Sequence, residues 1–174
     1  REVARAIGFD SRIGPKFLNA GPGLGGRCFQ KDILNLVYLC RHFGLPEVAD
    51  YWESVVKLNT WQQHRIARLV VEQLFGTVTG KRLAILGFAF KANTNDTREA
   101  PAIRIARDLL EEGAQLSIHD PKVAEAQISR DLQLEPASTA DGLNGTGSWA
   151  QATSIEAAVQ GADAVLILTA WQNY

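Results

Sequence analysis

The sequence Arg-Leu-Ala-Ile-Leu-Gly-Phe, residues 82–88, decides the fold class of this chain. Its short apolar run before a glycine predicts a buried strand. A helical pattern from about Pro101 to Glu112 follows and ends at Gly113, and Gln-Leu-Ser-Ile-His, residues 115–119, predicts a second strand. A strand, a helix and another strand in this order are typical of a parallel sheet.

The same alternation continues towards the last residue. A helical stretch, Ile155–Val159, and a strand Ala-Val-Leu-Ile-Leu-Thr, residues 164–169, give the order β-α-β-α-β. We therefore predict an α/β fold in which residues 77–174 form a sheet of the nucleotide-binding type. Residues 135–148 are rich in Gly, Ala, Ser, Thr and Asn, and we expect them to form a loop.

The first half of the chain is predicted to be helical. Residues 1–8 have the pattern of a helix end, and a strongly apolar helix is expected from about Gln30 to Gly44. A longer helical pattern covers residues 47–75, and helices of this length often bridge domains or subunits. We therefore expect residues 1–76 to form a region separate from the sheet.

Composition and charge exclude several classes of protein. With 174 residues and 46% hydrophobic residues, the chain is long enough to bury a good core. The 18 basic and 19 acidic residues nearly balance, so neither nucleic acid nor an anionic membrane is the expected partner. No apolar run approaches the roughly 20 residues of a membrane span. The first residues do not resemble a secretory signal, and we expect a cytoplasmic protein.

A glycine-rich loop precedes the first long helix. It reads Asn-Ala-Gly-Pro-Gly-Leu-Gly-Gly-Arg-Cys-Phe-Gln-Lys-Asp over residues 19–32. Its glycines let the backbone approach a ligand closely, which suits a phosphate or a sugar ring held by N–H groups. These glycines are Gly21, Gly23, Gly25 and Gly26.

Cys28 lies where this loop enters the helix. Backbone N–H groups at a helix start and the nearby ammonium of Lys31 favour a thiolate, so we predict that Cys28 is a nucleophile. Asp32 falls one turn later, where the helix dipole stabilises a carboxylate in any case. Twelve residues of regular helix would separate Cys28 from Cys40 by roughly 18 Å, which excludes a disulfide, and we expect Cys40 to be buried. The three histidines have no metal-ligand spacing, and we predict no metal site.

Residues 87–101 leave the carboxyl end of the first predicted strand, where ligands bind in open α/β sheets. Lys91 and Arg98 supply two cations there. For Asp96 and Glu99, a capping box at the start of the next helix is favoured over catalysis.

Asp120 follows the second predicted strand, where a dinucleotide-binding fold holds a ribose hydroxyl. The first strand-to-helix turn has no glycine triplet, however. We therefore favour a turn role for Asp120 beside Pro121.

The glycine loop and the segment Gly-Phe-Ala-Phe-Lys-Ala-Asn-Thr-Asn-Asp-Thr-Arg-Glu, residues 87–99, resemble the signature segments of the nucleotide-sugar dehydrogenases of the UDP-glucose/GDP-mannose family. Residues 11–18 and 163–171 also resemble that family, so the resemblance covers nearly the whole chain. It implies central dimerisation helices followed by a Rossmann-like UDP-binding domain, truncated at both ends.

The resemblance implies a twofold oxidation of the sugar C6 hydroxyl to a carboxylate with two NAD⁺. Cys28 matches the family's nucleophile, which forms a thiohemiacetal and then a thioester. Asp32 matches the residue that helps to orient the hydrolytic water, and Lys31 is part of the same motif.

The resemblance also implies binding residues. Arg98 matches a contact to NAD, and Arg12 matches an arginine that reaches the substrate of the neighbouring subunit in a homodimer or higher homo-oligomer. The residues predicted to contact the UDP-sugar are Phe17, Leu18, Asn19, Gly21, Gly25, Phe90 and Lys91.

The sequence departs from the family pattern without losing a matched chemical role; the departures are Leu24, Arg27, Ala100 and Ala170. The stretch Phe-Gln-Lys-Asp, residues 29–32, favours UDP-glucose over GDP-mannose or a UDP-N-acetyl sugar. A non-catalytic nucleotide-sugar-binding or dimerisation module, in which Cys28 is merely packed, is the alternative of a different class. The family's NAD-binding half does not precede Arg1, so we expect the 174-residue chain to be inactive alone.

Overall fold

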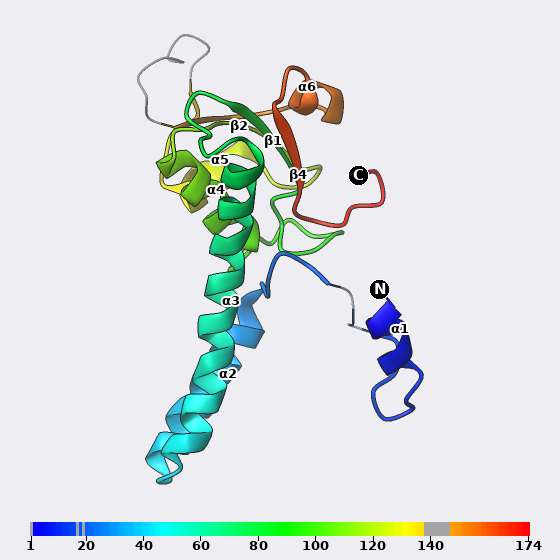
Figure 1. Ribbon diagram of the computed structural model, residues 1–174, viewed down its shortest axis with the longest axis vertical. Helices are drawn as coiled ribbons and strands as arrows, with labels where there is room; N and C mark the ends of the chain where they lie inside the picture. The colour runs from blue at the N-terminus through cyan, green and yellow to red at the C-terminus, as the bar shows by residue number, and fades with distance from the viewer. Residues whose placement is uncertain (1, 17, 19, 138–146) are drawn as a thin grey trace.

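The computed structural model describes residues 2–16, 18, 20–137 and 147–174. In that part of the chain, four parallel strands form one sheet in the order β3-β2-β1-β4 (Figure 1). The strands are β1 Arg82–Leu86, β2 Gln115–His119, β3 Ser148–Gln151 and β4 Ala164–Ile167. The predicted α/β fold with a parallel sheet is confirmed.

Helices cover both faces of the sheet. Because successive side chains of a strand point to opposite faces, β1 contributes to two cores. Leu83 and Ile85 lie in the main core with residues of α4 and α5, whereas Ala84 and Leu86 pack with α6 on the opposite face. These helices are α4 Pro101–Glu111, α5 Glu125–Leu132 and α6 Ile155–Val159.

Two elements of the sheet domain were not predicted. α5 buries only Ile128 and Leu132 among its eight residues, so its hydrophobic period is weak. β3 is four residues long and buries Trp149 alone. The expected loop 135–148 is therefore wrong at Ser148, which begins β3, while residues 138–146 lie outside the described residues.

The helical half contains three helices in its described part, which are α1 Glu2–Gly8, α2 Arg27–His42 and α3 Pro46–Gln73. α2 begins a few residues earlier than predicted, so Cys28 lies in its first turn. Figure 1 shows α2 beside the lower half of α3, projecting away from the sheet, and α1 apart from both.

α3 joins two hydrophobic cores. Its 28 residues span about 42 Å. Near its start, Ala49 packs with Ile33 and Val37 of α2. Near its end, Ala67 belongs to the main core under the sheet. α3 is thus anchored at both ends, and the site described below faces its middle. Cys40 lies in the α2–α3 core and is 8% exposed, as predicted.

Candidate active site

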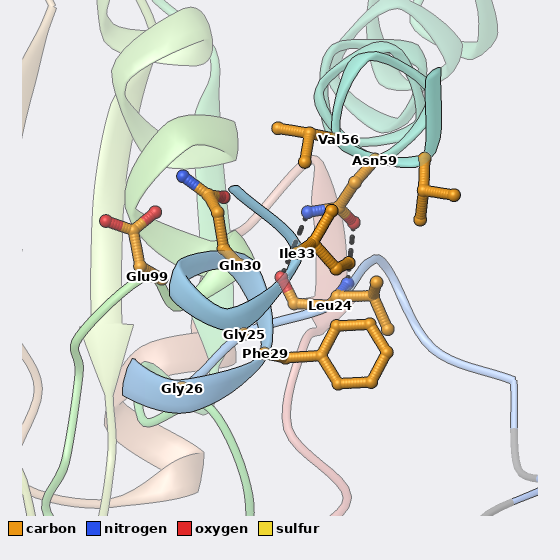
Figure 2. Close-up of a pocket in the computed structure, with 10 residues that line it drawn as sticks. Leu24, Gly25, Gly26, Phe29, Gln30, Ile33, Val56, Asn59 and Glu99 are labelled. Atoms are coloured by element: carbon orange, nitrogen blue, oxygen red, sulfur yellow. Dashed lines mark hydrogen bonds between the residues drawn. The ribbon is translucent and has the colours of Figure 1, made fainter. Parts of the chain in front are cut away.

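The glycine-rich loop is held against the middle of α3 by an amide side chain. The Leu24 N–H donates to Asn59 Oδ1 at 2.7 Å, and Asn59 Nδ2 donates to the Leu24 carbonyl at 3.2 Å (Figure 2). Gln63 Nε2 lies 3.5 Å from the same carbonyl. The cavity between this part of the loop and α3 holds only about 10 Å³. It is a packed contact and not a ligand site.

The other side of the loop packs on the segment that follows β1. A Cβ on Gly25 would lie 2.8 Å from the Glu99 carbonyl oxygen and 3.0 Å from Phe90 Cβ, which explains the glycine at this position. The Gly26 N–H donates to the Arg98 carbonyl at 3.0 Å. The two signature segments, which lie about sixty residues apart in sequence, therefore meet as the resemblance implies.

Cys28 opens into a hollow at this meeting point. The hollow has a volume of about 480 Å³, and its lining residues are Gly25, Gly26, Cys28, Phe29, Asp32, Ile33, Leu36 and Phe90. Cys28 is exposed, so its sulfur is accessible to a ligand. Asp32 lines the same hollow one turn further along α2. Lys31 is exposed and does not line it.

Two cations lie beside Phe90 and the loop, as predicted. The Lys91 ammonium lies 5.3 Å from the centre of the Phe90 ring. Arg98 donates to Asp96 through Nε at 2.8 Å and Nη2 at 2.6 Å. The hydrogen bond that Arg98 donates to Asp96 raises the pKa of Arg98, with a smaller coulombic contribution from Cys28. Arg98 thus stays cationic within electrostatic reach of the candidate nucleophile.

The predicted capping box before α4 is wrong. The N-cap residue of α4 is Ala100, whose side chain makes no capping hydrogen bond. The Asp96 carboxylate instead accepts from the Arg98 N–H at 3.0 Å and from the Arg98 guanidinium. Glu99 is exposed and has a positive φ of 54°. Asp96 therefore shapes the loop and orients Arg98 instead of starting the helix.

Among the described residues, Arg12, Leu18 and Gly21 do not line the hollow. Arg12 lies in the turn after α1, where its guanidinium pairs with Asp10 at 2.7 Å. Gly21 is exposed, and Leu18 is half-buried. Phe17 and Asn19 lie outside the described residues. The substrate contacts expected at these five positions stay predictions.

Asp120 has the turn role that was favoured for it. Its buried carboxylate accepts five hydrogen bonds at 2.8–3.3 Å. The donors are the N–H groups of Phe88, Ala89, Lys122 and Val123 and the indole of Trp171. This carboxylate is thus committed to the protein's own backbone and does not reach a ribose.

Asn59 and Gln63 were missed as site residues. In sequence they are polar positions of an otherwise helical pattern, 35 and 39 residues from Leu24. Their partner on the loop is brought to them only by the fold.

No group of three or more His, Cys, Asp or Glu side chains in the described residues is arranged to hold a metal ion. Within the same residues, no helix is long and apolar enough to cross a membrane.

Comparison with known proteins identifies both halves. The UDP-binding domain of the UDP-glucose/GDP-mannose dehydrogenase family matches residues 84–174, and the central domain of that family matches residues 1–61. UDP-glucose 6-dehydrogenase 2 of Oryza sativa subsp. japonica is 50% identical over 184 aligned residues, covering 99% of this chain and 37% of that protein. UDP-glucose 6-dehydrogenase of Caenorhabditis elegans is 49% identical over 173 residues, covering 99% and 35%.

A solved structure has the same arrangement of elements. A UDP-glucose dehydrogenase from the hyperthermophilic archaeon Pyrobaculum islandicum superposes with a TM-score of 0.80 at 32% identity, covering 99% of this chain and 36% of that one. The chain thus spans little more than a third of the length of these relatives. On the match of both family domains, the chain belongs to the UDP-glucose/GDP-mannose dehydrogenase family.

Proposed function

We propose that this chain carries the nucleophile and part of the UDP-sugar site of an NAD-dependent UDP-glucose 6-dehydrogenase. One observation carries the proposal: the loop that ends on Cys28 is clamped against Phe90, so that Cys28 and Asp32 line one hollow. The names of the relatives support UDP-glucose as the substrate. We further propose that residues 1–76 are the central region and residues 77–174 the UDP-binding domain.

Cys28 would add through Sγ to the aldehyde at C6 of the bound sugar, giving a thiohemiacetal. Oxidation of this adduct gives a thioester, and water then releases the carboxylate and restores the thiol. The N–H groups of the first turn of α2 favour negative charge on the attacking sulfur. Asp32 lines the same hollow and is placed to orient the water.

Arg98 is the residue that fits a phosphate-bearing cofactor, because its side chain is 55% exposed near Cys28 and its guanidinium is fixed by Asp96. NAD⁺, when bound, would accept the hydride that leaves the sugar carbon. The turn between β1 and α4 has no glycine triplet, so we propose that Arg98 is a peripheral contact. Accordingly, we expect no steady NADH production from the 174-residue chain with UDP-glucose and NAD⁺.

The proposed site is tested by ligand protection of its cysteine. We expect UDP-glucose to slow alkylation of Cys28 by iodoacetamide, because the sugar fills the hollow that the thiol lines. Peptide mapping by mass spectrometry separates Cys28 from the buried Cys40, which reports on unfolding. GDP-mannose and UDP-N-acetylglucosamine should protect less at equal concentration. Equal rates with and without every nucleotide sugar would support the non-catalytic module in which Cys28 is a packed thiol.

We also propose that a second copy of this chain covers the outer face of α2 and α3. These two helices and the turn between them expose large apolar side chains, and extensive exposed apolar surface is typical of protein–protein interaction sites. They are Phe29, Leu34, Tyr38, Leu39, Phe43, Leu45, Val48, Tyr51, Leu58 and Trp61. Figure 1 shows that the α2–α3 pair projects away from the sheet, as an element that reaches a partner would.

Light scattering of the purified chain tests this dimer. We expect a mass twice the 19.0 kDa of one chain. Leu58→Asp places a charge in the apolar face and should give a monomer. Phe75→Asp is the matched control, since Phe75 is 93% exposed but lies beyond the end of α3. A wild-type monomer at micromolar concentration, or a Leu58→Asp dimer, would argue against this interface.

A further inference from the structure

One side chain of α3 satisfies both backbone groups of a residue in the nucleophile loop. Asn59 accepts from the Leu24 N–H at 2.7 Å and donates to the Leu24 carbonyl at 3.2 Å. Such a two-way contact fixes both the position and the orientation of the Leu24 backbone, which a single hydrogen bond does not. Gln63, one turn later and only 7% exposed, reaches the same carbonyl at 3.5 Å.

The loop sequence is adapted to this contact. A Cβ on Gly23 would lie 2.9 Å from Asn59 Oδ1 and 3.1 Å from Gln63 Cγ, so a larger residue would push the amides away from Leu24. Two residues after Leu24, the Gly26 N–H is held from the opposite side by the Arg98 carbonyl at 3.0 Å. The loop is therefore fixed at two adjacent points immediately before α2 begins.

We propose that Asn59 is a positioning residue for Cys28, an inference that rests on the function proposed above. α3 is anchored in two cores, so the Asn59 amide transfers a fixed position from that helix to the loop. The loop in turn sets where the first turn of α2 starts and where Cys28 meets the hollow formed with Phe90. Asn59 does not line that hollow and acts only through the loop.

Removing the amide should loosen the site without unfolding the protein. The core between α2 and α3 is built from apolar side chains and does not include Asn59. The loss of both hydrogen bonds should weaken the binding of a ligand that needs the ordered loop by about tenfold. The effect should appear in UDP-glucose binding at Cys28 and not in the protection of Cys40.

The experiment measures the UDP-glucose concentration that halves the rate of Cys28 alkylation in the 174-residue chain. For Asn59→Ala we expect this concentration to rise about tenfold. Asn59→Asp keeps the acceptor for the Leu24 N–H and should recover part of the loss, to about threefold above wild type. Gln62→Ala is the matched control, because the hydrogen bonds of α3 to Leu24 come from Asn59 and Gln63 and not from this neighbouring amide. It should leave the value unchanged.

The outcomes separate this inference from the proposed function. If UDP-glucose fails to protect wild-type Cys28, the proposed function fails first and the positioning role falls with it. If wild-type protection is seen and Asn59→Ala retains the wild-type value, only the positioning role is overturned. Alkylation of Cys40 in both Asn59 variants would also overturn it, since Asn59 would then maintain the helical core in general.

Discussion

Cys28→Ser should abolish the complete oxidation of UDP-glucose in an enzyme that contains this chain. A serine hydroxyl is a far weaker nucleophile than a thiolate, and its ester hydrolyses more slowly than a thioester. Removal of a catalytic nucleophile typically costs on the order of 10³- to 10⁶-fold in turnover, and we expect a loss in that range. The first oxidation, from alcohol to aldehyde, does not need the sulfur. The yield of NADH per sugar should therefore fall from two to at most one.

The assay requires an enzyme that also contains a cofactor domain. We suggest exchanging the matching segment of the Caenorhabditis elegans relative, which is 49% identical over 173 residues, for this chain. The unmutated chimera gives the reference rate, and Cys40→Ser is the matched control, because Cys40 is buried in the α2–α3 core. Turnover of the Cys28→Ser chimera within tenfold of the reference would refute covalent catalysis by this residue.

The hydrophobic pattern predicted the elements of the fold wherever most of an element's side chains are buried. β1 shows this best, since four of its five side chains are buried and they appear in sequence as an uninterrupted apolar run. β3 contributes only the buried Trp149 to the core, and a single aromatic residue has no period to detect. α5 was not predicted for a related reason, because a short helix that buries only two side chains shows almost no hydrophobic period.

The part of the candidate site around Cys28 could be predicted, because several glycines precede this cysteine in the sequence. Contacts between segments that are distant in sequence could not be predicted from local pattern. Cys28 and Phe90 were paired through the family resemblance, and the packing of Gly25 on Phe90 gives that pairing a physical basis. Asn59 had no such signal, because an amide on a half-buried helix face is common. The prediction of a capping box was wrong because the Asp96 carboxylate accepts its hydrogen bonds from Arg98, two residues later and before α4 begins.

Asp120→Ala should produce the largest loss of stability of any single substitution considered for this chain. The carboxylate is 5% exposed and accepts five hydrogen bonds from three segments: the exit of β1, its own turn, and Trp171 near the last residue. Alanine would remove the acceptor of all these donors at a position that is 5% exposed. Each buried donor that loses its acceptor costs about 1–3 kcal/mol, although neighbouring losses do not add fully.

We expect Asp120→Ala to lower the free energy of unfolding by about 4 kcal/mol. That is a large fraction of the 5–15 kcal/mol typical of a domain. Urea denaturation followed by circular dichroism measures it. Asp163→Ala is the matched control, because Asp163 is exposed and accepts one backbone N–H, from Arg82 at 2.9 Å. It should cost about 1 kcal/mol or less. Equal losses in the two variants would show that the Asp120 network adds nothing beyond an ordinary turn.

Tyr174 provides a second, local readout of the same carboxylate. Its hydroxyl donates to the His119 carbonyl at 3.0 Å, and burial together with the charge of Asp120 raises its pKa well above the ordinary value of about 10. Because the folded state holds this proton more tightly, the corresponding stability is complete below about pH 10 and is lost as the pH rises further. Removing the Asp120 charge should bring the Tyr174 titration down towards the ordinary value. Tyrosinate absorbance measures this titration in the wild type and in Asp120→Asn. The Tyr174→Phe variant identifies the part of the signal that belongs to Tyr174, since the chain also contains the exposed Tyr38 and Tyr51. An unchanged Tyr174 titration in a folded Asp120→Asn variant would show that burial alone holds this proton.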